Sequence, residues 1–509
     1  MITTVTVGKG WHRFAGKDEG PEIEPGEYFR VQVHKPADEF KKRYGLIAAV
    51  PSPDSRMGRF CWLAPKEQWV VRSMLGFIVP KIDLSLVQVD WSLFPVKPEQ
   101  LRPWQIDFVK RMFAHVSSGK RFGMAEVVNL GGGKTLAGLL ALAVADNGVV
   151  VAPRHVHETW MSEAEKWRFQ APTCTTYESA YKFADLRPDV VVCDEVHKCK
   201  DSESARHQHV IKLAEHAQVV VGFTASLLGG RGPLDLQSLR VIEPGCVPAN
   251  DTAWRFLFGL DTRLEEVAPG RKAYVTKTWD TEKIARFVEP YVDTVDLSSL
   301  IASLPPLTET IIKLPTPKDY DLVLRGGSTT RSKSKRTAQL RQCTDGFVEM
   351  DDGTIVRLNS DKLKWIGEFV DHLNEPVVIY AAWRESVRSL VELFKDKRPA
   401  VLEGGCGDMA AQVSRFKSGE TSVLIANSAF SEGMNLQGVC RTMLFMSLSA
   451  NPVCLTQAIG RIHRPGQTRG CQIVHLQCEG TIDERAYELV KNHLDLSEDQ
   501  IEKLLEESA

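Results

Sequence analysis

The residues with the clearest chemical potential form a glycine-rich segment that ends in lysine and threonine. An apolar stretch over 122–128 precedes this segment, and a helix-like apolar run begins at Leu136. Glycines let backbone N–H groups turn inward around phosphate oxygens, a lysine reaches the β- and γ-phosphates, and a threonine hydroxyl ligates Mg²⁺. Val128 stands where the strict pattern has its first glycine, and a simple turn before a helix can also be glycine-rich. The residues of the predicted ATP and Mg²⁺ site are Gly131, Gly132, Gly133, Lys134 and Thr135.

An acidic pair follows about sixty residues downstream, where a valine run ends in Asp194 and Glu195. Carboxylates at the carboxyl end of a parallel strand face the crevice in which open α/β sheets bind ligands. We therefore expect Asp194 to hold Mg²⁺, usually through water, and Glu195 to orient and deprotonate an attacking water. Taken alone, the pair would be better explained as a strand end followed by a helix cap. Its place downstream of Lys134 favours the catalytic interpretation.

A third segment, Gln457–Gln467, carries two arginines that lack a local acidic partner. Arg461 and Arg464 are three residues apart, so helical spacing would place them on one face, with Gln457 one turn earlier. An anion is the expected partner, and a phosphate is the economical one. Arginine fingers of this kind accelerate phosphoryl transfer by about 10³ to 10⁵ in other NTPases. A solvated basic face is the alternative.

The elements that position these residues have an α/β pattern from about residue 100 onward. Short β-branched runs such as Val149–Ala152, Val190–Cys193 and Val219–Phe223 alternate with helix-length amphipathic stretches. Continuous valine runs suit parallel strands that are covered on both faces. A second set of such runs extends from Pro376 to Leu476. The pattern predicts two parallel-sheet α/β lobes.

The chain length of 509 residues corresponds to about three domains. Residues 1–95 alternate with period two and predict a small β-rich module, whose tryptophans either pack in a core or form a surface for nucleic acid or a partner. We expect a first lobe over 96–245, an inter-lobe segment over 246–306 and a second lobe over 307–495. An acidic C-terminal helix is expected over 496–509.

Composition excludes several classes of protein. The formal net charge of −2 argues against a protein that wraps nucleic acid with its whole surface, although it allows a local basic groove. Eleven cysteines without a C-x-x-C pair suggest reduced thiols rather than a zinc site. No apolar run has the length of a signal or membrane segment. We expect a soluble cytoplasmic protein of a bacterium or a virus-infected cell, with the nucleus as a further possibility.

Together these segments resemble the superfamily-two helicases, and among them the Swi/Snf-type DNA translocases, over about residues 100–490. Leu101–Gln105 is similar to the adenine-recognition segment, with Gln105 as the reader, and Asp194–His197 is similar to motif II. The most family-specific passage is Asn451–Gln467. The resemblance implies a helicase motor of two RecA-like lobes with ATP bound between them.

Other segments extend the resemblance. Arg154 follows an Ala-Pro pair as in motif Ia, which implies a nucleic-acid contact. Thr224 and Ser226 lie where motif III couples the lobes. Gly433 and Asn435 lie in a segment similar to motif V, which implies a nucleotide contact for the glycine and a coupling role for the asparagine.

The chain also departs from the family pattern. Thr-Gly-Thr-Pro is replaced by Thr224–Leu227, and the aspartate and tryptophan that usually precede Asn-Pro are Ser447 and Ala450. The usual Arg-Arg-x-Lys brace is not evident. These changes leave the ATP chemistry intact and bear on how tightly hydrolysis is coupled to movement.

A basic segment from Arg325 to Arg341 includes Lys333, Lys335 and Arg336 and has no acidic residue. Its glycines and serines predict a mobile loop, which either contacts DNA or is simply solvated.

The resemblance implies a monomeric DNA-dependent ATPase that translocates on duplex or branched DNA and remodels it in replication, recombination or repair. RNA is a less favoured partner, and protein partners would bind through the N-terminal module. A strand-separating DNA or RNA helicase is one alternative. A nucleotide-switched DNA clamp with slow turnover is another, motivated by the altered Thr224–Leu227 segment.

Overall fold

The structure is a computed structural model, and its chain divides into two compact units. One unit contains Met1–Val128 and Lys134–Val295, and the other contains Asn129–Gly133 and Asp296–Ala509. Among the described residues, no helix combines the length and apolar character needed to cross a bilayer. The structure describes residues 2–7, 12–15, 18–22, 26–31, 42, 47–50, 61–65, 67–75, 82–128, 131–228, 231–268, 270–325, 333–404, 409–427, 435–449 and 452–491.

The N-terminal module contains a six-stranded sheet in which neighbouring strands run antiparallel, as the period-two alternation predicts. Helix α2 (Gln68–Leu75) follows it and buries Trp69 and Val70 in the core of the first lobe. Arg240 pairs with Glu67 at 2.8 Å beside this helix. Trp11 lies outside the described residues. The strands, in the order β1-β4-β6-β5-β2-β3, are β1 (Ile2–Val7), β2 (His12–Ala15), β3 (Asp18–Glu22), β4 (Gly26–Val31), β5 (Ile47–Val50) and β6 (Cys61–Pro65).

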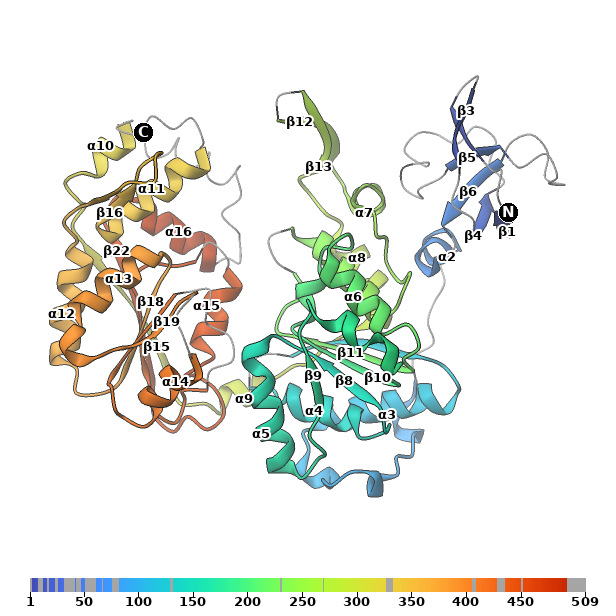
Figure 1. The fold of residues 1–509 in the computed structure, drawn as a ribbon, viewed down its shortest axis with the longest axis horizontal. Helices are drawn as coiled ribbons and strands as arrows, with labels where there is room; N and C mark the ends of the chain where they lie inside the picture. The colour runs from blue at the N-terminus through green and yellow to red at the C-terminus, as the bar shows by residue number, and fades with distance from the viewer. Residues whose placement is uncertain are drawn as a thin grey trace. The chain divides into compact units, whose positions relative to one another are not determined.

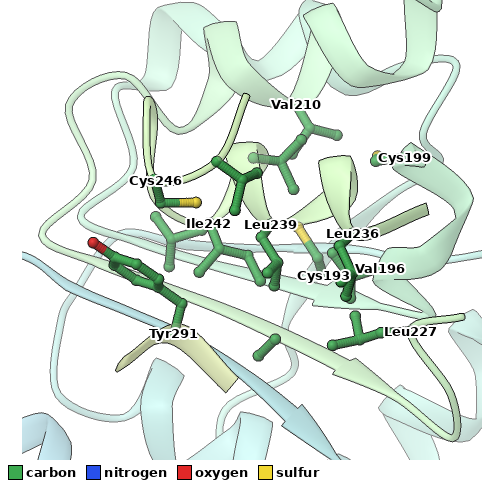
Figure 2. Close-up of a cluster of buried hydrophobic side chains, with 14 of the residues drawn as sticks. Cys193, Val196, Cys199, Val210, Leu227, Leu236, Leu239, Ile242, Cys246 and Tyr291 are labelled. Atoms are coloured by element: carbon green, nitrogen blue, oxygen red, sulfur yellow. The ribbon is translucent and has the colours of Figure 1, made fainter. Parts of the chain in front are cut away.

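The first lobe is built on a parallel six-stranded sheet, β14-β7-β11-β10-β8-β9. The valine runs form its central strands and are buried on both faces, which explains their continuous apolar character. One face packs against α3, α4 and α5, and the other against α6 and the segment that contains Leu236, Leu239 and Ile242 (Figure 2). The elements are α3 (Pro103–Ser117), β7 (Phe122–Val127), α4 (Lys134–Leu142), β8 (Gly148–Val151), α5 (His157–Trp167), β9 (Thr173–Thr175), β10 (Val190–Asp194), α6 (Ala205–Leu213), β11 (Val219–Thr224) and β14 (Val292–Thr294).

Most of the segment that the sequence led us to expect between the lobes belongs to the first lobe. Strand β14 pairs with β7, and Trp254 and Ile284 are buried in the first-lobe core, so this unit continues to Val295. The hairpin of β12 and β13 projects beyond α7 (Figure 1). The elements are α7 (Asp251–Phe258), β12 (Thr262–Ala268), β13 (Arg271–Thr276), α8 (Thr281–Val288) and, in the second unit, α9 (Ser298–Ala302).

The second lobe repeats the plan with the parallel sheet β15-β22-β21-β18-β20-β19, so the predicted pair of RecA-like lobes is confirmed. Helices α12 and α13 cover one face, and α14, α15 and α16 pack on the other. The elements are β15 (Leu307–Leu314), α12 (Asp361–His372), β18 (Val377–Ala381), α13 (Arg384–Leu393), β19 (Ala400–Leu402), α14 (Met409–Lys417), β20 (Val423–Asn427), β21 (Thr442–Phe445), α15 (Pro452–Ile459), β22 (Cys471–Cys478) and α16 (Ile482–Lys491).

A smaller core forms where α10 and α11 pack on α16, through Tyr320, Leu340 and Ile482. The described part of the basic segment, from residue 333, is helix α11, which corrects the expectation of a mobile loop. The helix forms because Leu340 and Cys343 on it are buried in this core. The elements are α10 (Tyr320–Arg325), α11 (Lys333–Asp345), β16 (Phe347–Glu349) and β17 (Ile355–Arg357).

A buried carboxyl cluster ties the strand before the glycine segment to its neighbours. Arg111 on α3 lies 3.1 Å from Glu126 on β7 and 2.6 Å from Asp293 on β14. Burial raises the pKa of Glu126 to about 8, against the attraction of Arg111 and with a further rise from Asp293. Glu126 therefore keeps its proton in the folded chain at pH values at which the unfolded chain has lost it.

This proton predicts a pH-dependent stability. Between about pH 4.5 and about pH 8 unfolding releases the Glu126 proton, so the contribution of this residue to the free energy of unfolding falls as pH rises. We expect Glu126→Gln to flatten the decline of the unfolding temperature across that range, as measured by circular dichroism. Glu282→Gln, at the exposed Glu282–Arg286 pair, is the control and should leave the profile unchanged. Parallel profiles for Glu126→Gln and the wild type would contradict the assignment.

Candidate nucleotide site

The glycine segment joins the end of β7 to the start of α4, and its backbone has the form that phosphate binding requires. Gly131 and Gly133 have φ values of +77° and +91°, a left-handed region that favours glycine. Gly132 is buried, and Thr135 is half-buried in the first turn of α4. Backbone N–H groups and the helix dipole at such a turn attract anions.

Lys134 is the first residue of α4, and the surroundings of its charged group are the clearest indication of a phosphate site. Its Nζ is buried and donates no hydrogen bond to any described residue. The nearest carboxylate oxygen, Glu195 Oε1, lies 3.7 Å away, beyond hydrogen-bond distance. A buried ammonium without a hydrogen-bonded anion is costly, so this position fits a phosphate oxygen.

Asp194 ends β10 and is held from two sides. Trp160 Nε1 donates to its Oδ2 at 3.0 Å, and the Tyr177 hydroxyl donates to its carbonyl oxygen at 2.6 Å. Trp160 is fully buried and lies against Gly138 of α4, where an added Cβ would lie 2.4 Å from the indole ring. Gly138 therefore makes room for the ring that orients Asp194. Sequence reasoning missed this glycine, whose only signal is its place inside an apolar helix.

Glu195 has a left-handed backbone, with φ +60° and ψ +53°, which is strained for a residue other than glycine. The turn brings its carboxylate beside two neighbours. His197 Nδ1 lies 3.3 Å from Glu195 Oε2, and Thr224 Oγ1 lies 3.5 Å from the same oxygen. His197 Nδ1 also lies 3.0 Å from Thr224 Oγ1. The carboxylate is thus contacted by one residue of the turn that follows β10 and by the last residue of β11.

The predicted coupling residues of the first lobe adjoin this carboxylate. Thr224 Oγ1 donates to the Ser226 carbonyl at 2.7 Å and accepts from the Ser226 amide at 3.1 Å. The segment that departs from the family pattern is therefore an ordered turn in contact with Glu195. His197 was not among the predicted site residues, although it lies two residues after the acidic pair.

Two predicted contact residues differ in exposure. Gln105 is buried at the third position of α3, where its Oε1 accepts from the Arg102 amide at 2.9 Å. The carbonyl of this predicted adenine reader thus caps its own helix. Arg154 is exposed at the start of the turn Arg154–Val156, so it is accessible to a large ligand.

The arginines of the second lobe do not share a helix face, which corrects the sequence expectation. Helix α15 ends at Ile459, and Arg461 and Arg464 follow in successive turns. The buried Gln467 side chain fixes these turns by donating to the carbonyls of Cys440 at 3.1 Å and Ile462 at 3.2 Å. A tertiary contact therefore overrides the helical spacing.

The remaining predicted residues of this lobe lie around these turns. Gln457 and Arg461 are both buried, whereas Arg464 is half-buried and donates to Asn435 Oδ1. The two arginines thus have different surroundings. Gly433 lies outside the described residues, as do residues 496–509.

The described basic residues of α11 contact neighbouring groups of the same lobe. Lys335 pairs with Asp351 at 2.8 Å, and Arg336 donates to the Leu324 carbonyl. Arg341 is buried inside the lobe. The side chain of Lys333 lies outside the described residues. Of the described basic side chains here, Lys335 is the most open, with 38% of its side chain exposed.

The oxygens of Thr135 and Asp194 fit Mg²⁺, a hard cation that usually combines one or two protein oxygens with phosphate and water ligands. Within the described ranges, no group of three or more His, Cys, Asp or Glu residues could hold a metal ion unaided.

Two parallel-sheet lobes, with a phosphate loop and an acidic pair in the first and an arginine segment in the second, define a helicase-type NTPase motor. Comparisons with known proteins agree with this class. Residues 361–466 match the family model "Helicase conserved C-terminal domain".

Two curated relatives cover most of the motor. RNA polymerase-associated protein RapA of Yersinia enterocolitica is 25% identical over 352 residues, which are 59% of this chain and 36% of RapA. Chromodomain-helicase-DNA-binding protein 1-like of Danio rerio is 23% identical over 494 residues, which are 84% of this chain and 46% of the relative. The chain thus spans less than half the length of either relative.

Among solved structures, the Sulfolobus solfataricus SWI2/SNF2 ATPase core in complex with dsDNA is similar, with 18% identity and a TM-score of 0.35. The match covers 82% of this chain and 98% of that one, and at this TM-score it adds nothing to the assignment. In the helicase domain and in these two relatives, the chain is similar to the Snf2-type proteins of helicase superfamily two.

The contact between Gly138 and Trp160 gives a prediction. Gly138→Ala should destabilise the protein by about 1–3 kcal/mol, because the new methyl group overlaps the buried indole. Displacement of Trp160 should also loosen Asp194 and lower ATP turnover. Gly367→Ala is a matched control, because its Cβ would make only ordinary contacts near 3.6 Å inside α12. Urea denaturation and steady-state ATPase assays provide the measurements, and equal behaviour of the two variants would contradict the role of Gly138.

Proposed function

We propose that this chain is an ATP-dependent DNA translocase that moves along duplex or branched DNA and remodels it. The observation that carries the ATPase part is the buried Lys134 ammonium, which lacks a hydrogen-bond partner among the described residues and lies 3.7 Å from Glu195. Similarity to the Snf2-type proteins supports the use of DNA. One of the relatives is named as a DNA-binding protein.

The proposal assigns chemical roles to the predicted residues of the glycine segment, the acidic pair and the arginine segment. Lys134 and the backbone N–H groups of Gly131–Gly133 neutralise the β- and γ-phosphates. Glu195, held by His197 and Thr224, accepts the proton of the attacking water. Mg²⁺, held by Thr135 and Asp194, would neutralise charge that develops on the phosphate oxygens. Arg461 and Arg464 supply positive charge to the transferred phosphoryl group.

DNA would be bound mainly through its phosphates, because a translocating motor must move over any sequence. Arg154 and the basic residues of α11, Lys333, Lys335 and Arg336, are the proposed contacts. Such binding weakens steeply with salt and shows little sequence preference. Replication, recombination or repair is the proposed setting.

The ordered turn at Thr224–Ser226 keeps the slow clamp as a second candidate, because this turn contacts the proposed base and departs from the family sequence. A clamp would bind DNA in a nucleotide-dependent way with negligible turnover. Measured ATP turnover therefore separates the two candidates.

Two substitutions test the ATPase. Lys134→Ala should abolish nucleotide binding, because it removes the cation that faces the phosphates. Glu195→Gln should retain binding and lose about 10² to 10⁴ in kcat, because the amide cannot accept the water proton. Fluorescent-nucleotide titration and phosphate release with and without duplex DNA provide the measurements. Negligible wild-type turnover that DNA does not stimulate would overturn the enzyme and leave the clamp.

The nucleic-acid substrate is tested with a panel of single-stranded, duplex and forked DNA and RNA. We expect duplex or branched DNA to stimulate the ATPase most strongly. The wild type should displace the third strand of a DNA triplex in the presence of ATP and leave a simple fork paired. Unwinding of the fork without triplex displacement would instead identify a strand-separating helicase.

The basic helix is tested by charge reversal. Replacing Lys333, Lys335 and Arg336 with glutamate should weaken DNA binding and reduce the slope of log K against log salt by about one for each lost phosphate contact. Fluorescence anisotropy across a salt series measures both quantities. Arg286→Glu, at an exposed position of α8, shows the effect of one charge reversal away from α11. An unchanged slope in the triple variant would remove α11 from the DNA interface.

A further inference from the structure

The second lobe buries a network of charges that the ATP chemistry does not use. Lys362 on α12 is fully buried, with Nζ 3.0 Å from Asp345 Oδ1 and 2.7 Å from Asp483 Oδ2. Burial disfavours the ammonium form, but the attraction of Asp483 and Asp345 outweighs it and raises the pKa of Lys362. Lys362 is therefore a cation held between two carboxylates.

A second buried cation balances the network. Arg341 lies one turn before Asp345 on α11, and its guanidinium carbon is 5.5 Å from the centre of the Trp383 ring. Its Nη2 donates to the Leu448 carbonyl. Two cations and two carboxylates thus neutralise one another inside the lobe.

The network reaches the residues that follow β21 through two side chains of α11. Asp345 Oδ2 accepts from the Ser447 hydroxyl at 2.7 Å, and Arg341 binds the neighbouring carbonyl of Leu448. Ser447 Oγ also accepts from the Ala382 amide at 3.0 Å, next to β18. Residues 447 and 448 are therefore fixed from both α11 and the sheet.

These two residues lead into the arginine segment. Helix α15 begins at Pro452, and Arg461 follows its end. The far end of the segment is held by the Gln467 side chain and by the Leu436 amide, which donates to the Arg461 carbonyl at 3.0 Å. The buried network around Lys362 thus holds the N-terminal approach to the arginine segment, as the Gln467 and Leu436 contacts hold its C-terminal part.

Stability alone does not explain this anchor. Replacing a buried ionic group with well-packed apolar residues is often neutral or stabilising, because desolvation offsets the attraction between the charges. A satisfied polar network instead fixes one geometry, because each bond has a defined direction. The fixed geometry here is that of residues 447 and 448.

We propose that Asp345, neutralised by Lys362, is a positioning residue that sets the arginine segment for ATP turnover through its hydrogen bond to Ser447. The inference rests on the proposed ATPase function. The family pattern usually has an aspartate at the position of Ser447. In this chain, Asp345 of α11 instead brings a carboxylate into contact with the Ser447 hydroxyl.

Two serines offer a matched test, because both donate to the same oxygen of Asp345. Ser447 does so from the segment before α15 at 2.7 Å, and Ser386 does so from α13 at 2.6 Å. Ser447→Ala should lower kcat on the order of tenfold at an unchanged KM for ATP, because it releases the segment without removing a buried charge. Ser386→Ala should lose comparable stability and keep its kcat. Equal kcat values for the two variants would overturn the proposal.

An exchange of groups provides the second test. Asp345→Ser alone leaves Lys362 with one carboxylate, and Ser447→Asp alone places two carboxylates together, so each should lower kcat. The double variant D345S/S447D restores one carboxylate beside one hydroxyl and should recover most of the lost kcat. Assays are run below the unfolding temperature of every variant. Additive losses in the double variant would contradict the direct contact.

Amide hydrogen exchange tests the positioning role of Asp345 independently of ATP hydrolysis. Exchange over residues 452–467 should be faster in Ser447→Ala than in Ser386→Ala, whether or not the chain hydrolyses ATP. Absent turnover in the wild type would overturn the ATPase and leave the exchange comparison to decide the anchor. Equal exchange in the two variants would overturn the anchor even if the wild-type ATPase is active.

Discussion

The buried ammonium of Lys134 is the constraint around which the first lobe is organised. Its Nζ lies 3.7 Å from a carboxylate oxygen of Glu195 and forms no hydrogen bond among the described residues. Closer approach would satisfy both charges and leave no place for a phosphate oxygen. The strained backbone of Glu195 and its contacts with His197 and Thr224 hold the carboxylate back. Packing thus maintains a separation that electrostatics alone would close.

Other clusters of charged residues are neutralised in different ways in the two lobes. In the first lobe Glu126 keeps its proton, so the cluster with Arg111 and Asp293 remains neutral without a second cation. In the second lobe Lys362 has carboxylates on two sides. Neutrality reached through a proton varies with pH, whereas neutrality reached through fixed charges does not. The second arrangement suits a network that must hold the arginine segment in one position.

Local sequence was a good guide where one element alone decides the structure. The valine runs predicted the parallel strands, and the positions of Lys134, Asp194 and Glu195 placed the chemistry at the strand ends. Contacts between distant segments decided the rest. The short strand β14 is stabilised by pairing with β7 and has no strong pattern of its own. Gln467 turns the chain after α15 through carbonyls that no local spacing reveals.

The chain is nearly neutral overall, and some of its exposed charges are paired with charges of opposite sign. The exposed cations Lys313 and Lys395, for example, lie within 3 Å of carboxylate oxygens. Pairs of this kind contribute little to stability, but they cancel the long-range field, which salt screens beyond about 10 Å in any case. A motor that moves along DNA needs attraction that is confined to one track, because a uniformly basic surface would bind DNA without allowing it to slide. In the proposed translocase, paired surface charges of this kind would leave these parts of the surface weakly attractive to phosphate.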